Sequence, residues 1–431
     1  METIAIFGLG FVGFPLAITY ATKGQRVIGV DINEKHIALL KNGVSDSCER
    51  VNGQSIESVL QDVLQKGTLQ LTTDPKEAMA KADYVIITVG IPVLPDETLN
   101  FTWLDQAAQT IGSLLRKGQT VVLRSTVPPH TTRKRFCRML ENASGLKAGD
   151  DFYLGYSSER MAEGKAFEEL TTMPTPVAGI NEASLRKTEH LLSMVCDNVI
   201  PAESIEIVEM SKVIENLSRD VNIAFVNELA LFAQSIGLEI NKVIAVANTH
   251  KRVKLLSPGP GVGGYCIPNA YYYLSNVEGE KHPLSLSYMS RELNESVPEA
   301  MVQIAEKTLQ ANGIDPKKAV FALFGMGMKD YSNDLRHSPS IMVLKALQKR
   351  GYQVRVYDPI TEWKEMETVS SFEELIHHAD CLMILAKQDE PKLTDIPYLT
   401  SHLKKGALIV DTRNTLNSAK VIQEGLTICK L

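Results

Sequence analysis

The sequence lacks the features that mark disulfide-stabilised, zinc-binding, membrane-spanning and nucleic-acid-binding proteins. No apolar run approaches the roughly 20 residues that span a bilayer, and no basic run would neutralise a nucleic-acid backbone. The cysteines are scattered, with no Cys-x-x-Cys pair and no histidine at zinc-ligand spacing: Cys48, Cys137, Cys196, Cys266, Cys381 and Cys429. We therefore expect no disulfide framework, no metal site, no nucleic-acid partner and no membrane partner.

The N-terminus also lacks a charged leader and a cleavage site, so we expect a cytoplasmic protein. With 44% hydrophobic residues, 22% charged residues and a formal net charge of −6, the composition is that of a globular protein. The 431 residues are too many for one ordinary core and predict two or three domains.

What the sequence does contain, at its start, is a nucleotide-binding pattern. Thr3 to Phe7 is a short β-branched and apolar run that leads into Gly8-Leu9-Gly10-Phe11-Val12-Gly13, and a helix pattern follows. The first glycine permits a tight turn, the second brings the backbone close to a pyrophosphate, and the third allows close packing of helix on strand. A second strand, Gln25 to Val30, ends at Asp31, whose carboxylate suits a ribose diol and repels a 2′-phosphate. The pattern predicts a dinucleotide site that prefers NAD to NADP.

Strand and helix patterns continue to alternate, which predicts a parallel sheet. Buried-strand patterns run from Tyr84 to Val89, from Thr120 to Leu123 and from Phe152 to Tyr156. The carboxyl ends of such strands are where open α/β sheets bind ligands. Thr126 is therefore a candidate water or substrate contact, although a turn or helix cap explains it equally well. Glu159 is a candidate general base, although a carboxylate after a strand is usually only solvated.

A long helical stretch and a second α/β unit follow. Apolar residues recur at helical spacing from Ile205 to Ala247, which predicts one long helix, or two joined near Gly237. A further helix is predicted from Met289 to Gln310. In the second unit we expect strands at Ala319 to Phe324, Gln353 to Tyr357, Cys381 to Ala386 and Ala407 to Asp411, and a helix at Ser340 to Lys349.

The chain is organised around a loop from Ser257 to Ala270 that holds Cys266. Its glycines alternate with prolines, are incompatible with a helix or a central strand, and permit positive φ: Gly259, Gly261, Gly263 and Gly264. This pattern predicts a cysteine nucleophile on a shaped turn. A buried structural cysteine is the common alternative.

A second polar group supports the nucleophile. Glu209, Lys212 and Asn216 follow one another at offsets of three and four, which places all three side chains on one face of a helix. A cation and an amide on that face can stabilise an oxyanion formed on a thiol adduct.

Taken together, these residues resemble the UDP-glucose/GDP-mannose dehydrogenase family over nearly the whole chain. The stretches that carry the resemblance are Phe7 to Gly13, Ser125 to Thr132, Ser158 to Leu170, Glu209 to Glu228, Arg252 to Pro268, Arg291 to Pro298, Lys329 to Pro339 and Asp411 to Asn414. Within the family, the chain is most similar to the branch that acts on UDP-N-acetylhexosamines, the UDP-N-acetylglucosamine and UDP-N-acetylmannosamine 6-dehydrogenases. This closer resemblance is carried by Arg252-Val253, by the segment from Pro258 to Gly264 and by Cys266-Ile267.

The resemblance implies an α/β protein with two Rossmann-like, doubly wound parallel-sheet domains joined by a long central helix and a helical middle domain. The implied domains are an NAD-binding domain at 1–200, a central helical and dimerisation domain with the cysteine loop at 201–311, and a UDP-sugar-binding domain at 312–431. It also implies a homodimer formed through the helix after Ile205, which buries an apolar stripe that one chain cannot cover.

The activity implied is the oxidation of a sugar C6 alcohol to a carboxylate with two NAD⁺, as in polysaccharide biosynthesis. Cys266 captures the aldehyde as a thiohemiacetal, a second hydride transfer gives a thioester, and water releases the acid. The resemblance makes Lys212 and Asn216 the oxyanion stabilisers, Glu159 the acid/base carboxylate and Thr126 the water-positioning hydroxyl.

The resemblance further implies the binding residues. For the cofactor they are Gly8, Gly10, Phe11, Val12, Gly13, Asp31, Thr88, Val89 and Thr126. For the UDP-sugar they are Glu159, Lys212, Asn216, Arg252, Gly263, Lys329 and Arg336. Basic side chains suit a pyrophosphate, although without the family Arg252, Lys329 and Arg336 would be interpreted as solvated surface charges.

One position departs from the family pattern. Family members usually carry an aspartate four residues after the cysteine, and this chain has Ala270 there, with Tyr265 and Asn269 also altered. Loss of one acid/base group typically lowers a rate by about 10²- to 10⁴-fold. Three hypotheses follow: a full dehydrogenase; an altered enzyme that performs a partial oxidation or recycles hydride in an epimerase- or dehydratase-like reaction; and a nucleotide-sugar binder without turnover.

Overall fold

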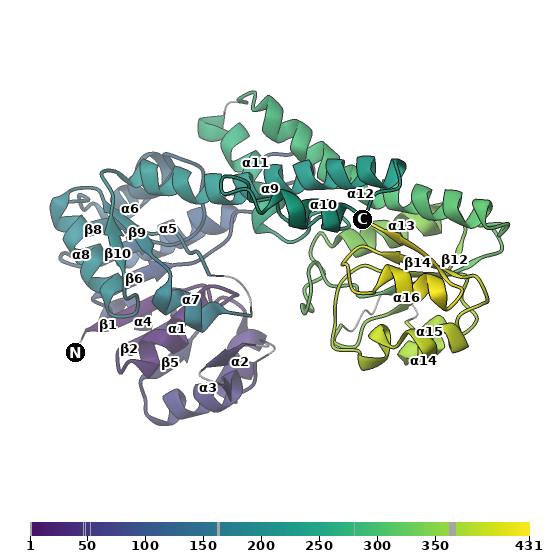
Figure 1. The fold of residues 1–431 in the computed structure, drawn as a ribbon. Helices are drawn as coiled ribbons and strands as arrows, with labels where there is room; N and C mark the ends of the chain where they lie inside the picture. The colour runs from purple at the N-terminus through teal and green to yellow at the C-terminus, as the bar shows by residue number, and fades with distance from the viewer. Residues whose placement is uncertain are drawn as a thin grey trace. The chain divides into compact units, whose positions relative to one another are not determined.

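A computed structural model describes residues 2–45, 47, 49–51, 53–161, 164–279, 281–361 and 368–431. Cys48 lies outside these residues. The chain forms two compact units: one comprises Met1–Glu215 and Tyr272–Pro283, the other Asn216–Tyr271 and Leu284–Leu431 (Figure 1). The chain passes between the units inside helix α9 (Ile205–Ser235), inside helix α11 (Cys266–Ser275) and between Pro283 and Leu284, so α9 and α11 contribute residues to both units.

The first unit is built on a sheet with the strand order β10-β9-β8-β7-β6-β1-β2-β5. The strands are β1 (Thr3–Phe7), β2 (Arg26–Val30), β5 (Leu69–Thr72), β6 (Tyr84–Ile87), β7 (Thr120–Leu123), β8 (Tyr153–Tyr156), β9 (Thr175–Gly179) and β10 (Val199–Pro201). All neighbours pair in parallel except β8 and β9. Strand β1 lies between β2 and β6, so the strand order reverses at β1, where α/β sheets of this kind bind nucleotides.

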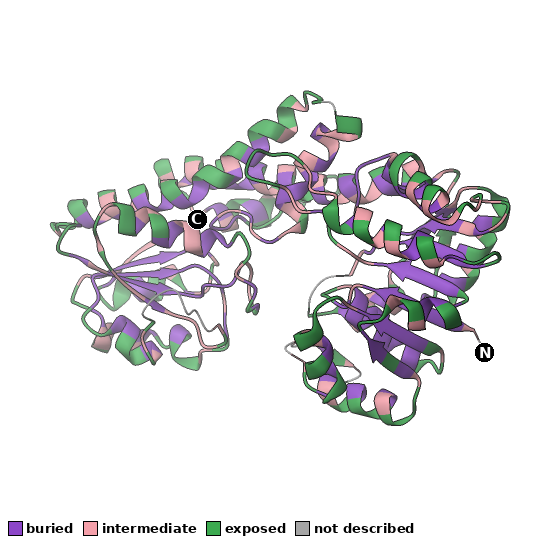
Figure 2. Ribbon diagram, turned by 180° about the vertical axis from the view of Figure 1, so that it is seen from behind, coloured by how far each residue is buried: buried purple, intermediate pink, exposed green. Residues whose placement is uncertain are grey.

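Helices surround this sheet. They are α1 (Gly13–Thr22), α2 (Glu34–Lys41), α3 (Ile56–Gln65), α4 (Pro75–Lys81), α5 (Thr102–Leu114), α6 (Cys137–Ser144), α7 (Ala166–Thr172) and α8 (Glu182–Ser193), together with a short π-helix, η1 (Thr132–Phe136), and a hairpin of β3 (Arg50–Val51) and β4 (Gln54–Ser55). Strands β1, β6 and β7 are buried along their whole length, which explains their continuous apolar sequences (Figure 2).

The second unit contains a smaller parallel sheet with the order β12-β11-β13-β14-β15. Its strands are β11 (Val320–Phe324), β12 (Gln353–Tyr357), β13 (Cys381–Ile384), β14 (Leu408–Asp411) and β15 (Thr427–Lys430). Its helices are α10 (Ile240–Ala247), α12 (Ser285–Ala311), α13 (Pro339–Lys349), α14 (Phe372–Ile376), α15 (Ile396–His402) and α16 (Ser418–Gln423), with 3-10 turns at η3 (Pro391–Thr394) and, in the first unit, at η2 (Val277–Gly279). The predicted fold class is confirmed, whereas β15 was not predicted.

The long helical stretch consists of two helices, as one of the two alternatives predicted. Helix α9 ends at Ser235 and α10 begins at Ile240. Gly237 between them has a φ of +75°, a left-handed conformation that glycine adopts readily and that ends a helix.

The prediction that a loop runs as far as Ala270 is wrong. Helix α11 begins at Cys266, so the cysteine is the first residue of a helix and not the middle of a turn. Pro268 is compatible with this helix because a proline in the first turn removes an N–H that has no partner inside the helix. The glycines therefore end two residues before the cysteine, at Gly264.

Across the described residues, no helix is both long and apolar enough to cross a membrane. Within the same residues, no group of three or more His, Cys, Asp or Glu side chains has a geometry that could hold a metal ion.

Candidate functional site

The glycine turn after β1 has the geometry that a dinucleotide requires. Gly8 has a φ of +93°, and its N–H donates to the Val30 carbonyl at 2.8 Å. A Cβ added to Gly13 would lie 1.8 Å from the Gly8 carbonyl oxygen, so only glycine allows α1 to approach the strand this closely. A Cβ on Gly10 would meet no atom within 4 Å, which leaves this stretch of backbone open to a ligand.

Asp31 and Thr88 support the same turn. The Leu9 N–H donates to one carboxylate oxygen of Asp31 at 2.8 Å, and the Asn33 N–H to the other at 2.9 Å. The Thr88 hydroxyl donates to the Gly8 carbonyl at 2.7 Å from the end of β6, next to β1. The residues present thus fit a dinucleotide, with the carboxylate of Asp31 fixed beside the glycine turn.

Glu159 lies in a buried ion pair. Its Oε2 accepts from Nε and Nη2 of Arg124 at 2.9 and 2.6 Å, and its Oε1 accepts from the N–H groups of Arg160 and Met161 at 2.7 and 3.0 Å. The Arg124 and Glu159 side chains are 1% and 10% exposed. The alternative of a merely solvated carboxylate is therefore wrong, because the fold neutralises and directs this group.

Side chains on the first turns of α9 bind the two segments that contain the candidate site residues Thr126 and Glu159. Glu206 accepts from Nε of Arg133 in η1 at 2.8 Å, and Glu215 pairs with Arg160, next to Glu159. Glu209, between them, accepts from the loop that follows β7 and contains Thr126. Lys212 is half-buried on the same helix. Thr126, Glu159 and Lys212 thus belong to segments joined through α9.

The second unit contains the cysteine and the glycine loop. Gly261 and Gly264 have positive φ, of +127° and +83°, as the loop pattern predicts. The Gly264 N–H donates to the Arg336 carbonyl at 2.9 Å, and a Cβ on Gly263 would lie 2.7 Å from the His337 carbonyl oxygen. Cys266 follows, exposed, at the start of α11, where the N–H groups of a helix end can stabilise an oxyanion on the thiol.

A buried polar network supports this loop. Asn227 of α9 accepts from the Gly259 N–H at 3.0 Å and donates to the side chain of Asn294 at 2.9 Å. Asn294 donates to Asp220 at 2.8 Å, and Arg291 donates to the same Asp220 oxygen at 2.7 Å. All four side chains are almost fully buried. The sequence offered only a weak signal for them, since polar residues on long helices are usually exposed.

The basic candidates differ in their surroundings. Arg336 is paired with Asp334 at 2.6 Å, Lys329 is half-buried, and Arg252 is exposed. Arg413, which was not predicted, makes two hydrogen bonds to Asp330 at 2.8 and 2.7 Å, and its Nη1 lies 2.7 Å from the position of a Cβ on Gly259. The sequence signal that could have identified Arg413 is its position just after the end of a predicted strand.

The environment just beyond the cysteine is altered. Ala270 is buried, and so is Asn269. The Asn269 Nδ2 has no hydrogen-bond partner among the described residues. Asn216 on α9 is also buried, in the same unit as Cys266.

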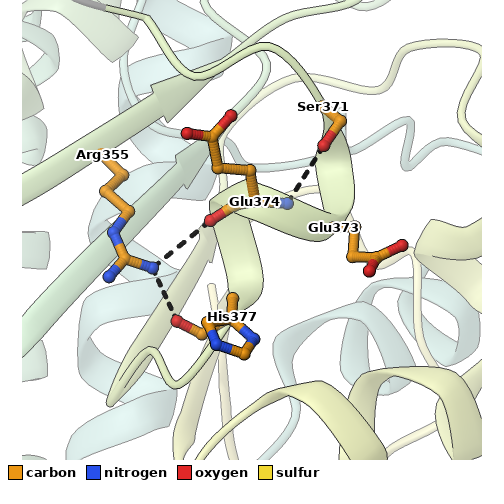
Figure 3. Close-up of a pocket in the computed structure, with 5 residues that line it drawn as sticks. All are labelled: Arg355, Ser371, Glu373, Glu374 and His377. Atoms are coloured by element: carbon orange, nitrogen blue, oxygen red, sulfur yellow. Dashed lines mark hydrogen bonds between the residues drawn. The ribbon is translucent and has the colours of Figure 1, made fainter.

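A separate pocket in the second unit does not belong to this site. It is lined by Arg355, Ser371, Glu373, Glu374 and His377 (Figure 3). The Arg355 guanidinium donates to the Glu374 and His377 carbonyls at 3.3 and 2.6 Å, and Ser371 caps α14. These groups join strand β12 to α14, and none of them was predicted as a site residue.

Fold and site together define a class, an NAD-dependent oxidoreductase of α/β architecture. Residues 2–195 match the NAD binding domain of the UDP-glucose/GDP-mannose dehydrogenase family, 206–296 its central domain and 322–418 its UDP binding domain. The chain therefore belongs to the UDP-glucose/GDP-mannose dehydrogenase family. The resemblance stated from the sequence is confirmed, and so are the enzyme class and NAD as the cofactor.

The chain is similar along its length to proteins of known activity. It is 33% identical over 419 residues to UDP-N-acetyl-D-mannosamine dehydrogenase of Pyrococcus horikoshii, covering 97% of both chains. A solved structure of that organism's UDP-D-ManNAc dehydrogenase matches with a TM-score of 0.91 and 32% identity, covering 100% of this chain and 99% of that one. UDP-N-acetyl-D-glucosamine 6-dehydrogenase of Salmonella typhi is 33% identical over 372 residues, 85% of this chain and 83% of that protein.

Proposed function

We propose that the chain oxidises the C6 hydroxyl of a UDP-N-acetylhexosamine to the uronate with two NAD⁺, through a thiohemiacetal and a thioester on Cys266. When bound, NAD⁺ accepts one hydride from the sugar carbon in each of the two oxidation steps. The first oxidation converts the alcohol to the aldehyde, and the Cys266 sulfur then adds to the aldehyde carbon. Oxidation of this adduct gives the thioester, and water cleaves the C–S bond to release the carboxylate and the thiol.

The remaining candidates act around this sulfur. Lys212 and Asn216 stabilise the oxygen anion of the adducts, and Thr126 positions the hydrolytic water. Glu159 is the acid/base carboxylate, and the four hydrogen bonds that it accepts fix its orientation. Arg252, Gly263, Lys329 and Arg336 hold the UDP-sugar, with basic groups on the pyrophosphate.

The observation that carries this proposal is the position of Cys266. It is exposed, it begins α11, and a glycine loop held by a buried polar network precedes it. A structural cysteine would be buried, as Cys381 is.

A second candidate function is supported by Ala270 and Asn269. Ala270 replaces the carboxylate that would assist water activation, so the thioester or the aldehyde can persist, and the buried Nδ2 of the neighbouring Asn269 has no hydrogen-bond partner among the described residues. In this case the enzyme releases a partly oxidised sugar, or returns the hydride within an epimerase- or dehydratase-like reaction.

Counting NADH per sugar separates these functions. UDP-N-acetylglucosamine, UDP-N-acetylmannosamine and UDP-glucose are each incubated with NAD⁺, and the products are identified by mass spectrometry. Two NADH and a uronate support the full oxidation, and fewer than two support the second candidate. If UDP-sugars and NAD⁺ raise the melting temperature but give no NADH and no new product, the chain is only a binder.

We also propose a homodimer formed through α9. Large apolar side chains at Ile207, Ile214, Phe225, Phe232 and Ile236 are each more than 40% exposed. Ile214, Phe225 and Phe232 are 7, 18 and 25 residues from Ile207, close to whole helical turns, so these four side chains form one stripe on α9, and Ile236 follows just after the end of the helix. A sedimentation measurement that finds a fully active monomer at micromolar concentration would contradict the dimer.

A cytoplasmic location stays a prediction.

A further inference from the structure

Glu209 is a buried carboxylate for which the proposed reaction has no role. It lies on α9, one turn before Lys212, and its side chain is fully buried. The two carboxylate oxygens accept separate backbone hydrogen bonds, from the His130 N–H at 2.6 Å and from the Thr132 N–H at 2.7 Å. Glu209 therefore bridges His130, near the end of the loop after β7, and Thr132, the first residue of η1.

That loop has an unusual backbone for its sequence. His130 has a φ of +74°, a left-handed conformation that is uncommon for a residue other than glycine. The π-helix η1 begins at Thr132, and single-turn π-helices are frequent at functional sites. At the other end of the loop, the buried Tyr156 hydroxyl donates to the Ser125 carbonyl at 3.1 Å. Thr126 lies between the two anchors, at Ser125 and at His130.

We propose that Glu209 is a positioning residue whose ionised carboxylate clamps the Thr126 loop to α9 and so fixes Thr126 relative to Lys212. This inference rests on the proposed function, in which those two side chains act on the same intermediate. A carboxylate can accept from both N–H groups at once. Protonation places a hydrogen on one oxygen, which can no longer accept from the N–H that faces it, so one side of the clamp is lost.

The charge state of the clamp can change near neutral pH. Burial raises the pKa of Glu209 to about 7, although the Thr132 and His130 hydrogen bonds oppose the shift. The neighbouring titratable groups are His130, whose imidazole lies 3.8 Å from Glu278, Glu206 with its partner Arg133, and Tyr156 of β8. Because the ionised form clamps the loop, kcat should rise with pH as Glu209 loses its proton.

The test is the pH profile of kcat between pH 5.5 and 8.5 for wild type and Glu209→Gln, with saturating NAD⁺ and UDP-N-acetylhexosamine. Misplacing a catalytic group by about 1 Å can lower a rate about 100-fold. We therefore expect Glu209→Gln to lose about 10- to 100-fold in kcat at pH 8, with the KM values within about threefold, and to lose the rise in kcat near pH 7. A purely structural role would lower the melting temperature and leave the profile unchanged.

Matched variants show which group causes the pH dependence of kcat. Glu206→Gln removes the hydrogen bond to Arg133 one turn earlier on α9, and His130→Asn removes the imidazole side chain at one of the two clamped residues. Asparagine tolerates the positive φ at this position and keeps the backbone N–H. Both variants should keep the kcat rise. Its loss in His130→Asn and its survival in Glu209→Gln would overturn the proposal.

Hydrogen exchange tests the clamp without turnover. In wild type, the protection factors of the His130 and Thr132 amides should fall as the pH drops below 7, whereas those of β7 should not. If no UDP-sugar is oxidised, the proposed function fails, but this measurement still shows whether Glu209 clamps the loop in a pH-dependent way. If Glu209→Gln does not fold, Glu209→Asp keeps the charge but is one methylene too short to span both N–H groups, so it should lower kcat and weaken the rise in kcat near pH 7. Protection that does not change with pH would refute the clamp.

Discussion

Replacing Glu159 by glutamine should destabilise the first unit strongly, because the change leaves the buried Arg124 guanidinium without a counter-charge. The glutamine offers one acceptor oxygen where the carboxylate accepts four hydrogen bonds. Breaking one partner of a buried ion pair costs about 3–5 kcal/mol. At roughly 2–4 °C per kcal/mol for a unit of this size, the melting temperature should fall by roughly 6–20 °C.

The assay is denaturant and thermal unfolding followed by near-UV signals, together with NAD⁺ binding at a temperature where the variant is folded. Asp151→Asn is a surface control, since it breaks a pair with Lys117, whose side chain is 73% exposed. The control should change stability by less than about 1 kcal/mol. The double variant Arg124→Met with Glu159→Gln should recover most of the loss, because it removes both charges of the pair.

The kinetic and the structural effects of Glu159 can then be separated. At a temperature below the melting temperature of the variant, kcat is calculated per folded molecule. Any decrease that remains is an effect of Glu159 on the reaction itself. If Glu159→Gln is within about 1 kcal/mol of wild type, the buried pair does not stabilise the unit and the reasoning from its burial is wrong.

Further predictions concern the cofactor, the nucleophile and its surroundings. NAD⁺ should have a higher kcat/KM than NADP⁺, since Asp31 is fixed beside the glycine turn; equal use of both would contradict this. Cys266→Ser should keep cofactor and UDP-sugar binding but form no uronate, as mass spectrometry will show, because an oxygen ester is a poorer acyl intermediate than a thioester. Ala270→Asp should raise the rate of the slow step by up to about 100-fold, and an unchanged or lower rate would mean that the buried site has been rebuilt. The raised pKa of Glu209 means that its contribution to stability is present below pH 4.5 and is lost as the pH rises through about 7; Glu209→Gln should remove this change from unfolding curves.

The elements of the sheets could be predicted from sequence because parallel strands are covered on both faces. Such strands are continuous apolar runs, and β1 and β7 were predicted with their observed bounds. The dinucleotide turn was also predictable, since Gly8 needs a positive φ and Gly13 has no room for a Cβ. Strands β5, β9, β10 and β15 were not predicted. Of these, β5, β10 and β15 lie at the edges of their sheets, and all the residues of β15 are only half-buried.

The sequence could not predict which charged groups pair in the interior. Arg124 and Glu159 are 35 residues apart, and Asp220 and Arg291 are 71 apart, so no local pattern connects them.

The helical start at Cys266 was missed for a different reason. The preceding glycines and Pro268 both suggest a loop, and only the structure shows that the proline falls in the first turn of α11, where it is tolerated.

The sharing of α9 and α11 between the two units has a consequence for dissecting the protein. The chain passes between the units at three places, so a single cut at any of them leaves part of one unit on the fragment that carries most of the other, and limited digestion should not release the two units intact. Fragments divided inside α9 or α11 would in addition each end in a broken helix. Unfolding of one unit should therefore fray the helices of the other, and the two should melt as coupled cooperative blocks and not as independent domains.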